Sequence, residues 1–105
     1  MRYAYKDLGE QPAGTTATVH WHGSAADIVL LDPVSFSKYR ARRSAVFYSA
    51  GGRYGRSPAR LSIPEDGRWY VVADFHGPAG DATVEVLKPD AEKDNASEES
   101  LVGVG

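Results

Sequence analysis

The chain has 105 residues, of which 42% are hydrophobic and 25% charged, and its formal net charge is -2. This size and composition fit one soluble globular domain, and the absence of cysteine excludes disulfides, a thiol nucleophile and a cysteine-ligated metal. No stretch approaches the roughly 20 apolar residues of a membrane span, and the first residues lack an apolar run of signal-peptide length. We therefore expect a cytoplasmic protein that makes no contact with a membrane.

The first third of the chain alternates apolar and polar residues, which predicts strands. RYAYKDL begins the first strand, and EQPAG at residues 10–14 predicts a turn. Between residues 16 and 22 the threonines and histidines share one face of a strand, and the apolar residues share the other. IVLL at residues 28–31 is a short apolar run, which predicts a strand covered on both faces.

A short helix is expected after this strand. The Asp-Pro pair at residues 32–33 ends the strand, and Ser35 is a suitable cap for one or two helical turns that reach Arg42. Residues 44–49 return to a strand pattern, and GGRYG at residues 51–55 predicts a glycine-rich loop.

The next elements are short strands joined by turns. Residues 57–63 alternate, and PEDG at residues 64–67 predicts a turn, because proline presets φ and glycine accepts a positive φ. RWYVVADF at residues 68–75 is the strongest strand pattern of the chain. A loop at residues 76–80 and a last strand at residues 82–87 follow.

About seven short strands and a single helix predict an all-β fold, an antiparallel sandwich or an open barrel with one short helical insert. We expect residues 1–88 to form a single β domain. Residues 89–105 are polar, acidic and small, which predicts a flexible C-terminal tail. The apolar strand positions predict a core made of Val19, Trp21, Ile28, Leu30, Leu61, Ile63, Trp69, Val71 and Phe75.

His20 and His22 form an H-x-H pattern that metal enzymes use. Side chains two residues apart on a strand point the same way, about 6.5–7 Å apart, so both could ligate one metal. A catalytic zinc site usually needs a third protein ligand, and the remaining histidine, His76, lies in a predicted loop. The threonines on the same face favour two solvated strand residues, and we expect no metal or other cofactor.

Charge is segregated along the chain. Seven basic residues and no acidic residue lie between Lys38 and Arg60, whereas all 14 acidic residues lie outside this window. Arginine binds phosphate and carboxylate through paired donors, and tyrosine faces can stack on bases or sugars. The residues expected to bind an anionic ligand are Arg40, Arg42, Arg43, Arg53, Tyr54, Arg56 and Arg60. The alternative is a solvated face whose arginines pair with acidic residues.

Several pieces of the sequence, in a fixed order, point to a known family. They are GSAADIVLLD, FSKYR, GG…SPARLSIPEDGRWYVVADF and TVEVL, and they fall within roughly residues 1–87. Together they resemble a family of small bacterial proteins known only as a domain of unknown function, of the DUF1883 type. The resemblance implies an all-β fold of sandwich or β-prism type, and it implies no activity.

The function that this pattern favours is non-catalytic recognition. Ser24 lies in GSA rather than in a G-x-S-x-G elbow, and GGRYGR lacks the lysine of a phosphate-binding P-loop. We therefore expect a module that binds a partner protein or an anionic small molecule through the face built from residues 38–60. A nucleic acid fits less well, because such domains are strongly basic. The alternatives are a metal-dependent enzyme that uses His20 and His22, and a structural, self-associating module.

Overall fold

The computed structural model describes residues 3–23, 25–41, 50–75, 81–89 and 97–104, and within them the chain forms nine strands and one helix. In chain order the elements are β1 (Tyr3–Gln11), β2 (Thr16–Trp21), β3 (Ala26–Leu31), α1 (Pro33–Arg40), β4 (Ala50–Tyr54), β5 (Ala59–Ser62), β6 (Gly67–Asp74), β7 (Ala82–Leu87), β8 (Ser97–Ser100) and β9 (Val102–Val104). The expected all-β fold of antiparallel sandwich type, with one short helical insert, is confirmed.

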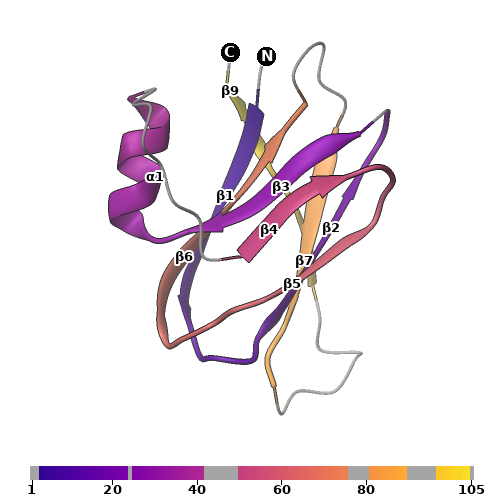
Figure 1. Ribbon diagram of the computed structural model, residues 1–105. Coiled ribbons are helices and arrows are strands. Elements are labelled where there is room, and N and C mark those ends of the chain that lie inside the picture. The colour runs from indigo at the N-terminus through magenta and orange to yellow at the C-terminus, as the bar shows by residue number, and fades with distance from the viewer. Residues whose placement is uncertain (1–2, 24, 42–49, 76–80, 90–96, 105) are drawn as a thin grey trace.

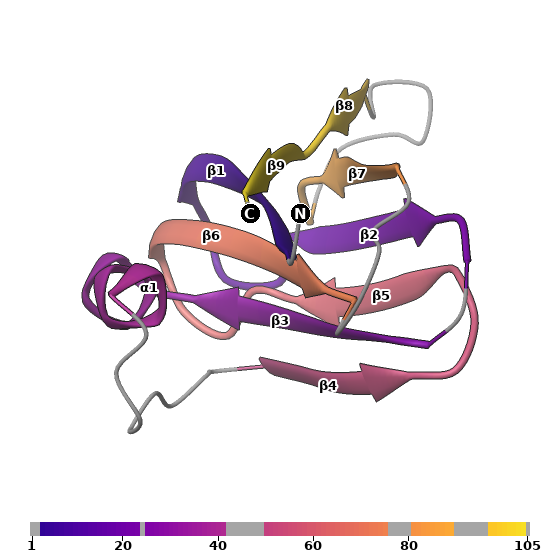
Figure 2. The same ribbon diagram turned by 90° about the horizontal axis from the view of Figure 1, so that it is seen from above.

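The strands form two antiparallel sheets that pack face to face (Figures 1 and 2). The first sheet has the strand order β4-β3-β6-β1-β9, and the second sheet has the order β5-β2-β7-β8. Among the described strands, only the consecutive pairs β3–β4 and β7–β8 stay within one sheet, and every other connection between successive strands crosses from one sheet to the other. Each sheet therefore has one face toward the other sheet and one outer face.

The main core lies between the two sheets. Eight of the predicted core residues are at most 5% exposed, and Phe75 packs against this core while it remains partly buried. Trp69 is 3% exposed, and its indole N–H donates a hydrogen bond of 3.0 Å to the Glu65 carbonyl oxygen. The period-two alternation thus assigned the inward face of the strands correctly, because successive strand residues point to opposite faces.

Helix α1 covers part of the outer face of the first sheet (Figures 1 and 2). Phe36 is its buried residue, and it joins Tyr3, Val29, Leu31 and Val72 in a second, smaller core. Val29 and Leu31 are therefore buried on the outer face, as the unbroken IVLL run predicted. Among the described residues, no helix is long and apolar enough to span a membrane.

The cap of α1 differs from the expectation. Asp32, not Ser35, is the N-cap residue, and its carboxylate accepts a hydrogen bond of 2.7 Å from the Ser35 backbone N–H. Pro33 occupies the first turn, where a missing N–H costs nothing. The same Asp-Pro pair that ends β3 thus also starts the helix, which ends at Arg40 rather than Arg42.

The glycine-rich segment is a strand rather than the predicted loop. Gly51 and Gly52 belong to β4, which pairs with β3 at the edge of the first sheet. Gly51 has a φ of 112°, and a Cβ placed there would lie 2.1 Å from the Ile28 carbonyl oxygen. Only glycine allows so close an approach of two backbones. The strand predicted at residues 44–49 and the loop predicted at residues 76–80 lie outside the described residues.

Two parts of the segment predicted to be a flexible tail are strands in the structure. β8 pairs with β7, and β9 pairs with β1. Between these strands, the Leu101 N–H donates a hydrogen bond of 3.0 Å to the Ala82 carbonyl oxygen, and its side chain packs against the main core. The folded unit therefore extends beyond residue 88. The edge strand of a sheet has unpaired backbone N–H and C=O groups. A mainly polar segment can form hydrogen bonds with these groups even though its sequence lacks apolar alternation.

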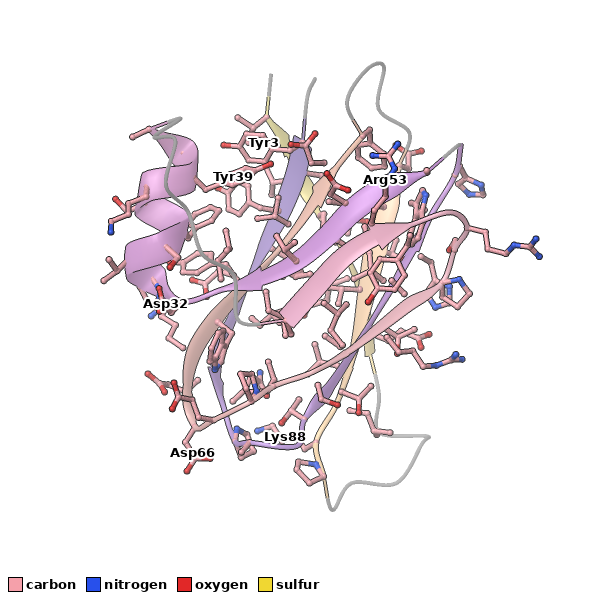
Figure 3. The ribbon with its side chains drawn as sticks, in the orientation of Figure 1. Tyr3, Asp32, Tyr39, Arg53, Asp66 and Lys88 are labelled. Carbon is pink, nitrogen blue, oxygen red and sulfur yellow. The ribbon has the colours of Figure 1, made fainter. Side chains whose placement is uncertain are left out.

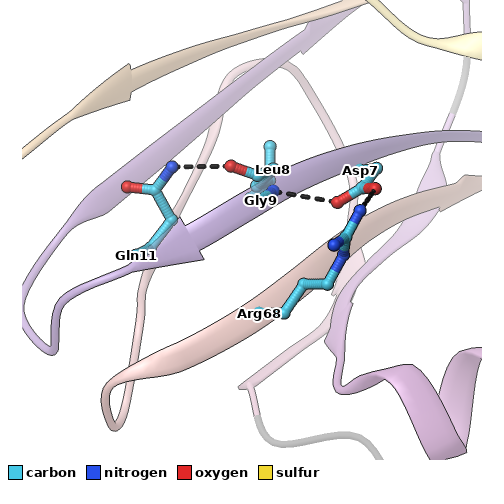
Figure 4. A network of polar contacts seen from close by, with 5 residues as sticks. All are labelled: Asp7, Leu8, Gly9, Gln11 and Arg68. Atoms are coloured by element: carbon cyan, nitrogen blue, oxygen red, sulfur yellow. Dashed lines mark hydrogen bonds and ion pairs between the residues drawn. The ribbon is translucent and has the colours of Figure 1, made fainter.

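Strand β1 has a bulge where it pairs with β6, and a network of polar contacts surrounds this bulge (Figure 4). The register of β1 with β6 shifts between Asp7 and Gly9. The Gly9 N–H donates a hydrogen bond of 2.9 Å to the Asp7 carboxylate, which also accepts one from the Arg68 guanidinium. This hydrogen bond from Arg68 holds the pKa of Asp7 below its usual value of 3.8.

Candidate functional site

A pocket of about 290 Å³ opens on the outer face of the first sheet, beside the last turn of α1. Its lining consists of Asp27, Val29, Leu31, Tyr39, Gly52, Arg53 and Asp74. Tyr39 comes from α1 and points toward the sheet, whereas Arg53 comes from β4 (Figure 3). The other lining residues belong to β3, β4 and β6. The pocket therefore combines an apolar floor with a small set of polar groups, as ligand sites commonly do.

The polar groups form one row across four strands. Arg53 on β4 is the register partner of Asp27 on β3, and Asp27 is the partner of Asp74 on β6. Asp74 is in turn the partner of Tyr3 on β1. Residues directly opposite each other on antiparallel strands have Cβ atoms roughly 4.5–5.5 Å apart. The pairing of the sheet thus places two carboxylates side by side at one end of the pocket.

Like charges directly opposite each other destabilise a sheet, and each carboxylate here has a partner that offsets the repulsion. The Arg53 guanidinium lies 3.6 Å from the Asp27 carboxylate. The Tyr39 hydroxyl donates a hydrogen bond of 2.5 Å to the Asp74 carboxylate. Burial, and next this hydrogen bond, raise the pKa of Tyr39 above its usual value. Tyr39 is therefore a neutral donor at physiological pH.

Tyr39 is held in place by the second core. Its ring meets the ring of Tyr3 edge-on, with the ring centres 5.0 Å apart, and the two labelled side chains are adjacent in Figure 3. Phe36, one turn earlier, stacks on Tyr70 with the centres 4.1 Å apart. The docking of α1 on the sheet therefore fixes the phenol that contacts Asp74.

The basic residues predicted to share one face do not converge there. Arg53 lies at the pocket, with its side chain 62% exposed. The guanidinium of Arg40, at the end of α1, lies 5.8 Å from the ring centres of both Tyr5 and Phe36, where it can make cation–π contacts. Arg56, which follows β4, is exposed. Arg42 and Arg43 lie outside the described residues.

Two predicted members of the basic face point elsewhere. Arg60 lies on β5 opposite Thr18, on the outer face of the second sheet, so that the whole sandwich separates it from Arg53. Tyr54 follows Arg53 on β4 and packs against the main core. The expectation of one shared face is therefore wrong for these two residues. Neighbours along a strand face opposite ways, and β4 and β5 belong to different sheets.

The two histidines do not reach the pocket. His20 lies on β2, and its Nε2 atom is 3.9 Å from the Glu85 carboxylate. Its alternation with Val19 and Trp21 places it on the outer face of the second sheet. His22 follows the end of β2 and is exposed. In the part of the chain that the structure describes, no group of three or more histidines and carboxylates could hold a metal ion.

The carboxylates of the pocket are the functional candidates that sequence reasoning missed. In the sequence, Asp27 and Asp74 are isolated carboxylates without metal-ligand spacing. A stronger signal was available, because each lies within a strand whose other residues are mainly apolar. A charged residue within such a strand needs a partner, and that requirement marks both positions.

Comparisons with known proteins identify a family and no activity. No curated protein and no solved structure matches the chain significantly. The model of one family, described as a domain of unknown function (DUF1883), matches residues 1–91, which include the whole pocket. The chain therefore belongs to the DUF1883 family.

Proposed function

We propose that the protein is a non-catalytic recognition module and that its pocket binds the positively charged group of a small molecule or of a side chain. The observation that carries this proposal is the pair of neighbouring carboxylates, Asp27 and Asp74, at one end of the pocket. Arg53 is the only cation among the described residues that line it. The lining thus has an excess of negative charge at neutral pH, which attracts a cation.

The chemistry of the lining supports an ammonium or guanidinium group as the ligand. Carboxylates accept charge-assisted hydrogen bonds from such groups, and Val29 and Leu31 offer apolar contact for an alkyl chain. A pocket of about 290 Å³ is at the small end of ligand sites, which suits one side chain or a molecule of similar size. Recognition rather than catalysis is supported because both carboxylates are fixed by partners, Arg53 and Tyr39.

The positions of the arginines favour a positively charged ligand over the negatively charged one expected from the sequence. The sequence favoured an anionic ligand, which would need several free guanidinium groups in one place. Arg53 is paired with Asp27, Arg40 lies against aromatic rings, and Arg60 is on the other sheet. We also propose a cytoplasmic location, which the absence of cysteine supports.

A calorimetric or NMR titration can test the proposed ligand class. The cationic probes are the amides of Nα-acetyl-lysine and Nα-acetyl-arginine, which keep their charged side chains. The amide of Nα-acetyl-glutamine is the neutral comparison, and inorganic phosphate is the anionic one. We expect the cationic probes to bind and Asp27→Asn to weaken them about tenfold or more, as the loss of a charged partner does. Asp81→Asn is the matched control, because Asp81 is exposed and does not line the pocket.

The variant Arg53→Gln separates the two possible ligand charges. Removal of the guanidinium takes away the cation beside Asp27 and makes the lining more negative, so a cationic probe should bind more tightly to this variant. Phosphate binding that is lost in Arg53→Gln, together with no binding of the cationic probes by the wild type, would instead establish the anionic ligand and refute the proposal.

A further inference from the structure

The edges of β1 and β7, on the side of the sandwich away from β4, are covered by the chain's own C-terminal segment, residues 97–104. The family match ends at residue 91, so this segment lies outside the matched domain. Without it, β1 would be the edge of the first sheet and β7 the edge of the second. The strands of the matched part thus leave two adjacent edges, which residues 97–104 cover.

The segment is bound in the way that a peptide is bound at a sheet edge. Four residues pair with β7, from Ser97 opposite Val86 to Ser100 opposite Thr83. After Leu101 the chain crosses to the first sheet, where three residues pair with β1, ending with Val104 opposite Tyr3. Main-chain pairing of this kind supplies affinity for an extended peptide, while a few side chains supply specificity.

Three side chains of the segment make specific contacts. Leu101 packs against the main core between the sheets, and Val104 packs against the second core. The Glu99 carboxylate lies 3.3 Å from the Lys6 ammonium group on β1. Val102, by contrast, is 55% exposed. The recognised pattern is thus a carboxylate, an apolar residue two positions later and a second apolar residue three positions after that.

We propose that the edges of β1 and β7 form a groove for an extended peptide of another protein, one with the pattern of Glu99, Leu101 and Val104, and that residues 97–104 occupy it as an internal ligand. Few side chains distinguish this segment from another extended peptide of the same pattern, because most of its contacts are made by the backbone. Its advantage is covalent attachment, which gives an effective concentration in the millimolar range. A partner peptide therefore binds by displacing the internal ligand.

The groove and the pocket are at opposite edges of the first sheet, and they can be tested separately. The probe is a fluorescein-labelled peptide with the sequence of residues 97–104, SEESLVGV, titrated into the full-length chain. Leu101→Ala weakens the internal ligand, so this variant should bind the probe about tenfold more tightly than the wild type. Val34→Ala is the matched control, because Val34 is an exposed apolar residue of α1 and the variant should bind like the wild type.

A charge reversal tests the register of the bound peptide. Lys6→Glu places a carboxylate opposite Glu99, so the full-length variant should prefer a probe with the change Glu99→Lys over the original probe. Hydrogen exchange should locate binding of either probe at β1 and β7. No other contact of the segment predicts this reversed preference.

Four results would overturn the proposal. The Leu101→Ala chain could bind the probe no better than the wild type, or the Lys6→Glu chain could keep the original preference. Failure of the Leu101→Ala chain to fold would show that the segment is part of the fold rather than a ligand. Sedimentation that shows a dimer unable to take up the probe would assign the groove to a second copy of this chain.

Discussion

Replacement of Phe36 by alanine should detach α1 while the sandwich stays folded. Phe36 is 5% exposed and stacks on Tyr70, with the ring planes 7° apart. A buried Phe→Ala change costs about 3–5 kcal/mol, and a stacked aromatic pair contributes about 0.5–1.5 kcal/mol beyond its buried area. An eight-residue helix is marginal by itself. The docking of α1 on the sheet should therefore be lost.

The main core should survive this change, because Phe36 belongs to the second core on the other side of the first sheet. Native-state hydrogen exchange provides the assay: amides of α1 should lose their protection, whereas amides of β2 and β7 should remain protected. Binding of the proposed cationic ligand should also be lost, since Tyr39 leaves the pocket with the helix. Trp69→Ala is the comparison, because it removes a main-core residue and should expose all elements together. Equal loss of protection in α1 and β2 of the Phe36→Ala variant would refute the separation into two cores.

Three further changes probe the backbone and the titrating groups. Gly51→Ala should destabilise the protein and lower its melting temperature, because the new methyl group meets the Ile28 carbonyl oxygen; an unchanged melting curve would contradict the close approach. The raised pKa of Tyr39 keeps its share of stability complete below pH 10 and removes it as the pH rises further; absorbance titration should show one late-ionising tyrosine that Tyr39→Phe removes. The lowered pKa of Asp7 provides stability above pH 3.8 that is lost as the pH falls below it. In Asp7→Asn, the urea concentration at the midpoint of unfolding should therefore fall less steeply with decreasing pH than in the wild type. The same pH dependence in both proteins would show that the contact between Asp7 and Arg68 contributes nothing to stability.

Local signals were read correctly from the sequence where the structure depends on a few neighbouring residues. The turn at residues 64–67 lies between β5 and β6, as its Pro and Gly predicted. The predicted position of the helix is confirmed, but the predicted cap is wrong, because Asp32 both ends the strand and caps the helix. Aspartate before proline can end one element and start the next, and the sequence pattern alone did not separate these two roles.

The glycine-rich segment and the C-terminal residues differ from the expectation for a shared reason. Both lack the apolar alternation that marks a strand, and both became strands because a neighbouring edge offered backbone partners. Gly51 lies against Ile28, and Leu101 lies against the main core. Each of these strands forms by pairing with a distant part of the chain, so its own local sequence does not predict it.

The sequence by itself determined the all-β class, the inward face of each central strand and the residues of the main core. Alternation of apolar and polar residues along a strand is a local pattern, and it specifies which face of the strand is buried. Only the tertiary structure decided which polar residues meet. Asp27 and Asp74 are far apart in the chain, and the register of β3 with β6 makes them neighbours. Arg53 and Arg60 are close in the chain, yet they lie on opposite faces of the sandwich because β4 and β5 belong to different sheets. Strand register and sheet membership are set by long-range pairing, and the candidate site is a product of both.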